Sequence, residues 1–180
     1  VERVNSSPAR FDMKKLEAIN GDKIRALTID DFLTRALPFL LRDGVISGTP
    51  TEVEVIRSAL PLIQERISRL KEVVPMLSFL FGDDVQYEDG ALASLREDPS
   101  RHVLEATLKE VEALENWSHT EIEERLRAAL IEGLGLKPRL AFGPVRTAVT
   151  GSHISPPLFE SMELLGKQRC IARLRKAING

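Results

Sequence analysis

Residues 56–82 read IRSALPLIQERISRLKEVVPMLSFLFG, and the spacing of their apolar side chains decides the fold class. In the first half of the stretch the apolar positions recur every three or four residues: Ile56, Leu60, Ile63, Ile67 and Leu70. This is the period of one face of an α-helix. The apolar stripe continues to Phe81 and stops at Gly82-Asp83-Asp84. The stretch therefore predicts helices that bury one face against the rest of the chain.

Helix-start signals occur on both sides of this stretch. They are predicted at Asp12, Thr28, Thr51, Asp98-Pro99, Ser118 and Gly143-Pro144. At Thr51–Glu54 and Ser118–Glu121 the pattern is a capping box, in which a hydroxyl and a carboxylate satisfy each other's unpaired amides. The two proline signals match an N-cap followed by proline at the first helical position. Asp43-Gly44 is typical of a helix end.

The sequence predicts an all-α fold. No segment alternates apolar and polar residues with period two between hairpin turns. Turn formers between Gly82 and Gly90 predict a boundary, which gives two small helical subdomains, residues 1–84 and 85–180. One undivided helical array stays open as an alternative, because aspartate and glycine also occur in ordinary interhelical loops.

Length and composition fit a cytoplasmic protein outside the membrane. The chain has 180 residues, 43% of them apolar, which is enough to bury a core. Its one cysteine, Cys170, cannot form an internal disulfide, and no apolar run approaches the roughly 18 residues of a membrane span. The chain starts at Val1 and not at methionine, so we expect a cut within a longer polypeptide.

Charge is distributed unevenly along the chain. The net charge is −2, but the segment from Lys137 onward has eight basic and two acidic residues, a net +6, against −8 for the remainder. Clustered cations attract polyanions, so the C-terminal third is the predicted binding region. Alternatively, the cations from Lys167 to Lys176 form a solvated face of a terminal helix.

No catalytic or metal-binding group is predicted in this chain. His102, His119 and His153 are scattered and lack the spacing of metal ligands. Cys170 is expected to be a small buried apolar residue, not a reactive thiol. The adjacent carboxylate pairs diverge by about 100° on a helix and are expected to be solvated.

A more specific pattern lies near the C-terminus. Residues 143–160 read GPVRTAVTGSHISPPLFE, and Leu164-Leu165-Gly166-Lys167 follows. They combine a buried cation, Arg146, with two proline-initiated helix starts and an exposed Ser-Pro-Pro-Leu-Phe knuckle. This combination predicts a recognition surface.

Two groups of residues resemble bacterial glutamyl-tRNA synthetases. Ser7–Gly21 contains a Phe-Asp-x-x-Lys-Leu-x-x-(Ile/Met)-Asn pattern, which in that family follows the catalytic core and begins the C-terminal body. Near the other end, Pro144–Gly151, Leu158–Glu160 and Leu165–Lys167 resemble the family's C-terminal signature. The two groups occur in the family's order, so the resemblance covers essentially the whole chain.

The resemblance implies a C-terminal anticodon-binding region of a class I aminoacyl-tRNA synthetase, a helical array whose partner is the tRNA for glutamate. In the family, a Rossmann domain that uses ATP and Mg precedes this region in cis and ligates glutamate to the tRNA. The chain has no His-Ile-Gly-His-like or Lys-Met-Ser-Lys-Ser-like element and no βαβ pattern. The fragment alone is therefore expected to be a non-catalytic monomer that needs no cofactor.

The resemblance also assigns site residues. Arg66 corresponds to an arginine, on a helix, that faces the third anticodon base. Its donors suit the O2 and N3 acceptors of cytosine and not the N1–H and N2–H donors of guanine. The other assigned contacts are Arg146, Ser155, Pro156 and Leu158. Without the resemblance, Arg66 is an exposed arginine that pairs with Glu65 or Glu72.

The four C-terminal contacts have distinct expected roles. Ser155 is expected to cap the next helix, with Pro156 at its first position, so that the helix N-terminus approaches nucleotide oxygens. Leu158 would offer an apolar platform for a base, and Phe159 would turn inward. The alternative function is an all-helical protein-interaction domain with no RNA role, whose apolar stripes bind a partner helix.

Overall fold

A computed structural model describes residues 12–82, 84–87 and 89–179, and every regular element in this part of the chain is helical. The predicted all-α class is confirmed. Part of the Ser7–Gly21 pattern, residues 7–11, lies outside the described residues.

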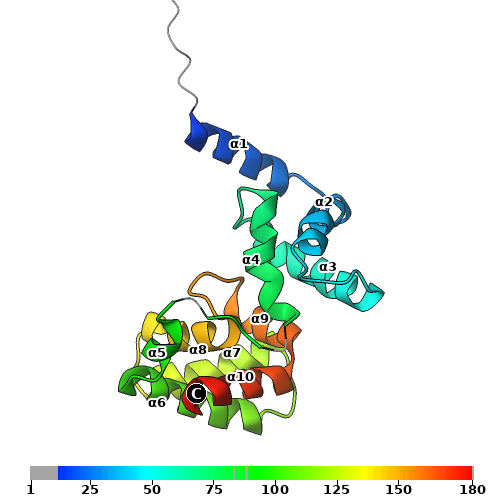
Figure 1. The fold of residues 1–180 in the computed structure, drawn as a ribbon. Coiled ribbons are helices and arrows are strands. Elements are labelled where there is room, and N and C mark those ends of the chain that lie inside the picture. Colours follow the sequence, from blue (N-terminus) through cyan, green and yellow to red (C-terminus); the bar gives the residue numbers. More distant parts are fainter. Residues whose placement is uncertain (1–11, 83, 88, 180) are drawn as a thin grey trace, which may run out of the picture.

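The N-terminal group of helices begins with α1 (Met13–Arg25), which projects away from the rest of the molecule (Figure 1). It continues with α2 (Ile29–Arg42), α3 (Pro50–Gln64) and α4 (Val73–Leu77). Single 3-10 turns, η1 (Leu70–Glu72) and η2 (Ser78–Leu80), flank α4. A non-helical connection then leads to the second group.

The C-terminal group comprises six α-helices and one π-helical segment among its described residues, and it has no strand there. The elements are α5 (Ala91–Leu95), α6 (Asp98–Ala113), α7 (His119–Leu126), the π-helix η3 (Arg127–Gly133), α8 (Pro138–Thr150), α9 (Leu158–Leu165) and α10 (Lys167–Asn179). Helix α10 packs against α6, α8 and α9. Helix α9 also contacts α3, and so it touches the N-terminal group.

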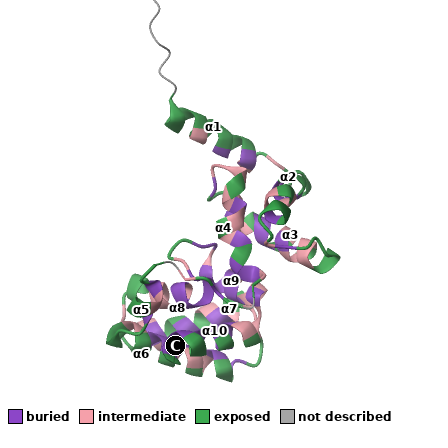
Figure 2. Ribbon diagram, viewed as in Figure 1, coloured by how far each residue is buried: buried purple, intermediate pink, exposed green. Residues whose placement is uncertain are grey.

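One apolar core joins the two groups. A single cluster of buried residues extends from Ile24 to Ile178. Figure 2 shows buried segments running from α4 into α9 and α8. The division into residues 1–84 and 85–180 stays a prediction, and its boundary falls in the connection between η2 and α5.

The apolar stripe of residues 56–81 is buried but not continuously helical. Ile56, Leu60, Ile63 and Ile67 are fully buried, as the spacing predicts. The chain nevertheless leaves the helix after Gln64, and the Glu72 carboxylate accepts a hydrogen bond from the Ser68 amide at 2.9 Å. Such a local side-chain bond offers the backbone an alternative to the helix.

Three predicted N-caps are confirmed. The side chains of Asp12, Thr28 and Ser118 accept bonds from amides in the first turns of α1, α2 and α7. At Ser118 only half of the capping box is present, because the Glu121 carboxylate accepts from the Asn116 amide group at 2.7 Å.

The predicted start at Thr51 is wrong by two residues. Thr49 is the N-cap of α3, and its hydroxyl and the Glu52 carboxylate form the capping box. Glu52 accepts from the Thr49 amide at 2.8 Å. Pro50, at the first helical position, is the signal that favours Thr49 over Thr51.

The proline signals also misplaced two helix starts. Helix α6 begins at Asp98 with Glu97 as N-cap, one residue earlier than predicted. Helix α8 begins at Pro138, so Pro144 lies inside it and starts nothing. Proline removes the bond to the carbonyl four residues earlier. Here that carbonyl belongs to Leu140, a residue that is 60% exposed.

The cations of α10 bind this chain itself. Lys167 donates to the carbonyls of Glu112 and Leu114, Arg175 pairs with Glu112, and Lys176 pairs with Asp84. Arg173 is only 3% exposed. Lys167, Arg169 and Arg173 thus bind carbonyls of the chain. Arg175 and Lys176 stay exposed in surface ion pairs, so the solvated-face alternative fits only the last part of this helix.

Candidate nucleic-acid interface

Arg146 is held in place by the loop that precedes α9. Its Nη1 donates to Ser155 Oγ at 2.5 Å and to the Pro156 carbonyl at 2.7 Å. Ser155 Oγ in turn donates to the Pro156 carbonyl at 2.9 Å. Within the described part of the chain, this guanidinium donates both of these bonds from Nη1. Nε and Nη2 can therefore serve a ligand.

Arg66 lies near Arg146, although the two come from different helical groups. The pKa of Arg146 is lowered, first by burial and then by the charge of Arg66, and Glu160 partly offsets this. Two like charges held near each other favour a ligand rich in negative charge or in hydrogen-bond acceptors. The structure thus brings together the two arginines that the sequence assigned to one site.

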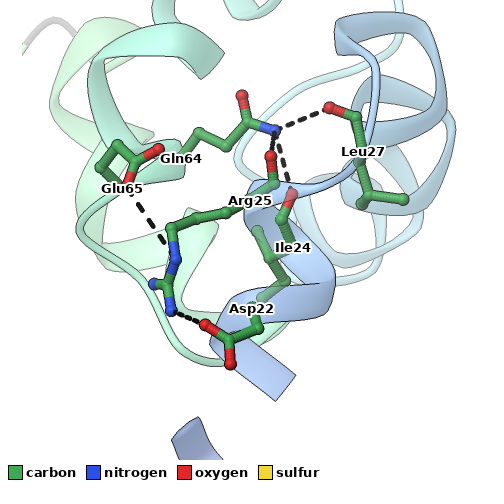
Figure 3. A network of polar contacts seen from close by, with 6 residues as sticks. All are labelled: Asp22, Ile24, Arg25, Leu27, Gln64 and Glu65. Atoms are coloured by element: carbon green, nitrogen blue, oxygen red, sulfur yellow. Dashed lines mark hydrogen bonds and ion pairs between the residues drawn. The ribbon is translucent and has the colours of Figure 1, made fainter. Parts of the chain in front are cut away.

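Arg66 sits in the turn that ends α3, one residue beyond the C-cap Glu65. It was expected on a helix, and its amide still donates to the Ile63 carbonyl at 2.8 Å. The neighbouring Gln64 fixes this turn to α1, because its side-chain amide donates to the carbonyls of Ile24 and Leu27, each at 2.9 Å (Figure 3).

The two carboxylates considered as partners of Arg66 are directed elsewhere. Glu65 lies 3.9 Å from Arg25 Nε, as Figure 3 shows, and Glu72 accepts the Ser68 amide. Arg25 is itself paired with Asp22 at 2.6 Å. Arg66 is exposed at the end of this network and can approach a ligand.

A surface pocket of about 470 Å³ lies beside Arg146. It is lined by residues of α8 and the following loop: Pro138, Arg139, Phe142, Gly143, Arg146 and His153. Phe142 packs edge-on against Phe159 with ring centroids 5.3 Å apart, and the Arg127 guanidinium lies 5.6 Å from the Phe142 ring centre. The pocket combines an aromatic ring with cations, which suits an unstacked base and its phosphate.

His153 adds a second polar group to this pocket. The Thr147 hydroxyl donates to the Gly143 carbonyl at 3.2 Å and lies 3.1 Å from His153 Nδ1. The His153 ring is therefore within hydrogen-bonding distance of Thr147 and contributes a polar side chain to the pocket lining.

Sequence reasoning missed Arg139, Phe142 and His153 as site residues. Because the helix start was placed at Gly143-Pro144, Arg139 and Phe142 were left outside the helix. With the start at Pro138, Arg139, Phe142 and Arg146 are spaced three and four residues apart and share one helix face. Lys137-Pro138 was the available signal.

The expected exposed knuckle is wrong. Ser155 and Leu158 are 6% and 3% exposed, and Pro156 is buried too. The N-cap of α9 is Pro157, so Ser155 caps nothing and Pro156 is not at the first helical position. Leu158 faces the core and offers no platform for a base in this arrangement. Phe159 does turn inward, as predicted.

The comparisons with known proteins identify the family of the chain. The sequence profile of a family described as the anticodon binding domain matches residues 31–178. The chain belongs to this family. Together with the relatives below, the match confirms the predicted resemblance to the anticodon-binding region of glutamyl-tRNA synthetases. The matched region is an anticodon-binding domain and not a catalytic one.

Curated relatives of this anticodon-binding domain are glutamate–tRNA ligases. The domain is 48% identical to the ligase of Saccharopolyspora erythraea over 178 residues, covering 97% of this chain and 35% of the relative. It is also 48% identical to the ligase of Kineococcus radiotolerans, covering 98% of this chain and 36% of the relative. The chain therefore spans about a third of the length of these proteins.

A solved structure shares the fold. The glutamate tRNA ligase of Elizabethkingia meningosepticum, in complex with its amino acid, superposes with a TM-score of 0.74 at 20% identity. The match covers 94% of this chain and 32% of that one.

Two further observations concern the described residues of the anticodon-binding domain. None of their helices is long and apolar enough to cross a membrane. No three of their His, Cys, Asp or Glu side chains are grouped to hold a metal ion.

Proposed function

We propose that this domain reads the anticodon loop of a tRNA that accepts glutamate, as the C-terminal part of a glutamate–tRNA ligase. The observation that carries the proposal is the proximity of Arg66 and Arg146, which come from two helical groups that meet where α3 contacts α9. Loop bases are read when they are splayed out and bonded along their edges. Two arginines and an adjacent aromatic pocket suit such bases.

In this proposal each assigned residue has a specific role. Arg66 donates to the cytosine at the third anticodon position. Arg146 donates from Nε and Nη2 to a neighbouring nucleotide. Ser155 and Pro156 act through Arg146, since they hold its Nη1. Leu158 supports the start of α9 from the core.

The remainder of the ligase would supply the chemistry. A catalytic domain joined in cis would bind ATP, Mg and glutamate, and this domain would contribute tRNA selection as a monomer. A cytoplasmic location fits its one cysteine, which is free.

Fluorescence titration with an anticodon stem-loop, at two salt concentrations, tests the proposal. The wild-type chain should bind, more weakly at higher salt, and Arg66→Ala and Arg146→Ala should each weaken binding about tenfold or more. Arg35→Ala removes an exposed arginine on α2 and is the matched control. Wild-type affinity in both site variants would refute the site. Capture of one protein partner without RNA binding would favour the protein-interaction alternative.

A further inference from the structure

Arg173 on α10 joins three parts of the chain through one guanidinium. It is 3% exposed. Its Nη1 donates to the Val149 carbonyl at 2.6 Å, and its Nη2 donates to the carbonyls of Phe79 at 2.7 Å and Gly82 at 2.9 Å. A buried cation that donates to carbonyls of distant segments fixes those segments to each other.

Arg169, one turn earlier on α10, binds the same segment. Its Nη1 donates to the Leu80 carbonyl at 2.6 Å, and its Nη2 donates to the Gly82 carbonyl. Carbonyls at a helix end lack partners within the helix and carry partial negative charge. The two guanidinium groups therefore clamp the end of η2.

The segment that follows η2 is also tied to the C-terminal group. Lys176 pairs with Asp84 at 2.7 Å, and the Tyr87 hydroxyl donates to the Ala148 carbonyl at 3.2 Å. Gly151, directly after α8, approaches this segment so closely that a Cβ there would lie 2.1 Å from the Gln86 carbonyl oxygen. Residues 79–82 and 84–87 thus lie against the C-terminal end of α8.

These contacts connect the two halves of the candidate site. Val149 lies on α8 three residues after Arg146. Phe79 lies in η2, which continues from α4 and the group that carries Arg66. One guanidinium therefore binds both the helix of Arg146 and the end of the Arg66 group.

We propose that Arg173 is a positioning residue for nucleotide recognition, which fixes the N-terminal group against α8 and so keeps Arg66 next to Arg146. This inference rests on the proposed function only where it predicts an effect on RNA binding. The fixed geometry itself is a property of the free chain.

The first test is a double-mutant comparison by stem-loop titration. Arg173→Gln should weaken binding at least tenfold, and Arg66→Ala added to it should cost less than a further twofold. The matched control is Arg175→Gln, which removes one charge from the same helix but pairs only with Glu112 of the C-terminal group. It should change affinity less than twofold. If Arg66→Ala kept its full cost in the Arg173→Gln chain, the inference would be wrong.

The second test needs no RNA. Spin labels on Ser58→Cys in α3 and Glu124→Cys in α7, both exposed positions, report the distance between the two groups. Cys170 stays unlabelled because burial raises the pKa of its thiol to about 12. Arg173→Gln should broaden a narrow distance distribution, and Arg175→Gln should leave it narrow. An unchanged distribution for Arg173→Gln would overturn the inference.

The two proposals can fail separately. If the wild-type chain did not bind the stem-loop, the proposed function would fail, and the spin-label distances would still decide the role of Arg173. If Arg173→Gln did not fold, Arg169→Gln would replace it in both tests. It removes the half-buried second guanidinium of the clamp, and the same outcomes would support or overturn the inference.

Discussion

Arg66 and Arg146 have the same charge, but they are held in different ways. Arg146 is fixed by Ser155 and the Pro156 carbonyl, whereas Arg66 extends from a turn whose neighbour, Gln64, is fixed. Discrimination between bases needs a donor aimed at one edge, and each bidentate contact is worth about 1–3 kcal/mol. Because Arg66 is the donor that we propose for the third anticodon base, its removal should change specificity as well as affinity.

The corresponding prediction concerns the third anticodon base. Changing cytosine to guanine in the stem-loop should weaken binding to the wild-type chain by about 1–3 kcal/mol, because guanine presents donors where Arg66 needs acceptors. Arg66→Ala should bind both stem-loops equally, as measured by titration. Discrimination that survived in Arg66→Ala would assign base reading to another residue.

Ser155 gives a prediction that separates positioning from contact. Ser155→Ala removes one acceptor of Arg146 Nη1 and should weaken stem-loop binding by about 0.5–1.5 kcal/mol. In an Arg146→Ala background the same change should have no further effect. Ser161→Ala is the control, because that buried hydroxyl donates to the Pro157 carbonyl and does not bond Arg146. If the losses of binding free energy in Ser155→Ala and Arg146→Ala were additive, this would indicate that Ser155 contacts the stem-loop directly.

Cys170 gives a pH-dependent prediction. Burial raises the pKa of its thiol to about 12, and this outweighs the lowering by Arg173 and Arg169. The native state therefore keeps the proton after the unfolded chain has lost it. Stability should be unaffected by this thiol below pH 9, and should then fall by about 1.4 kcal/mol per pH unit toward pH 12.

Urea unfolding between pH 7 and 10.5 measures this effect. Other groups also titrate in that range, so the comparison is with Cys170→Ala. The free energy of unfolding of the wild-type chain should fall more steeply above pH 9 than that of the variant. Parallel curves would show that the thiol has the same pKa in the native and unfolded states.

Residue roles could be predicted from the sequence only in part. Arg66 and Arg146 were identified by resemblance, and the buried character of Cys170 by its surroundings. Arg173 could not be found in this way, because a charged residue in an amphipathic stretch is expected to be exposed. Its partners lie far away in the sequence, so no local spacing indicates them.

At the scale of the helices, the N-terminus of α3 allows a direct comparison of two threonines. Thr49→Ala should lower the free energy of unfolding by about 1 kcal/mol, since it removes the side-chain acceptor of the Glu52 amide. Thr51→Ala, two residues later and exposed, should change stability by less than about 0.5 kcal/mol. Thermal or urea unfolding of both variants measures the difference. An equal loss of unfolding free energy in both variants would favour Thr51 as the N-cap.

At this scale, the caps at Asp12, Thr28 and Ser118 were predictable, whereas the predicted starts at Thr51, Asp98 and Pro144 were wrong. Asp12, Thr28 and Ser118 satisfy amides in their own first turns, which is a purely local effect. Pro144 fits inside α8 because its missing hydrogen bond falls at the exposed Leu140. Whether a proline starts a helix or lies within it thus depends on solvent access, which the local sequence does not report.

At the scale of the whole molecule, the structure changes which basic residues are expected to meet RNA. The predicted polyanion region was the C-terminal segment with eight basic residues. In the structure the cations of α10 bind carbonyls and carboxylates of the chain itself. The cations at the candidate interface are Arg66, Arg139 and Arg146, which come from both helical groups.

This difference predicts the salt dependence of RNA binding. For single strands, the logarithm of the binding constant falls by about 0.7 per neutralised phosphate for each tenfold rise in salt. Three interface cations predict a slope of about −2, whereas the eight C-terminal basic residues would give about −6. Titration of the stem-loop at several salt concentrations measures the slope. Arg139→Gln should reduce its magnitude by about 0.7, and Arg175→Gln should leave it unchanged because that guanidinium is paired with Glu112. A slope near −6, or one that responds to Arg175→Gln, would place the RNA on α10.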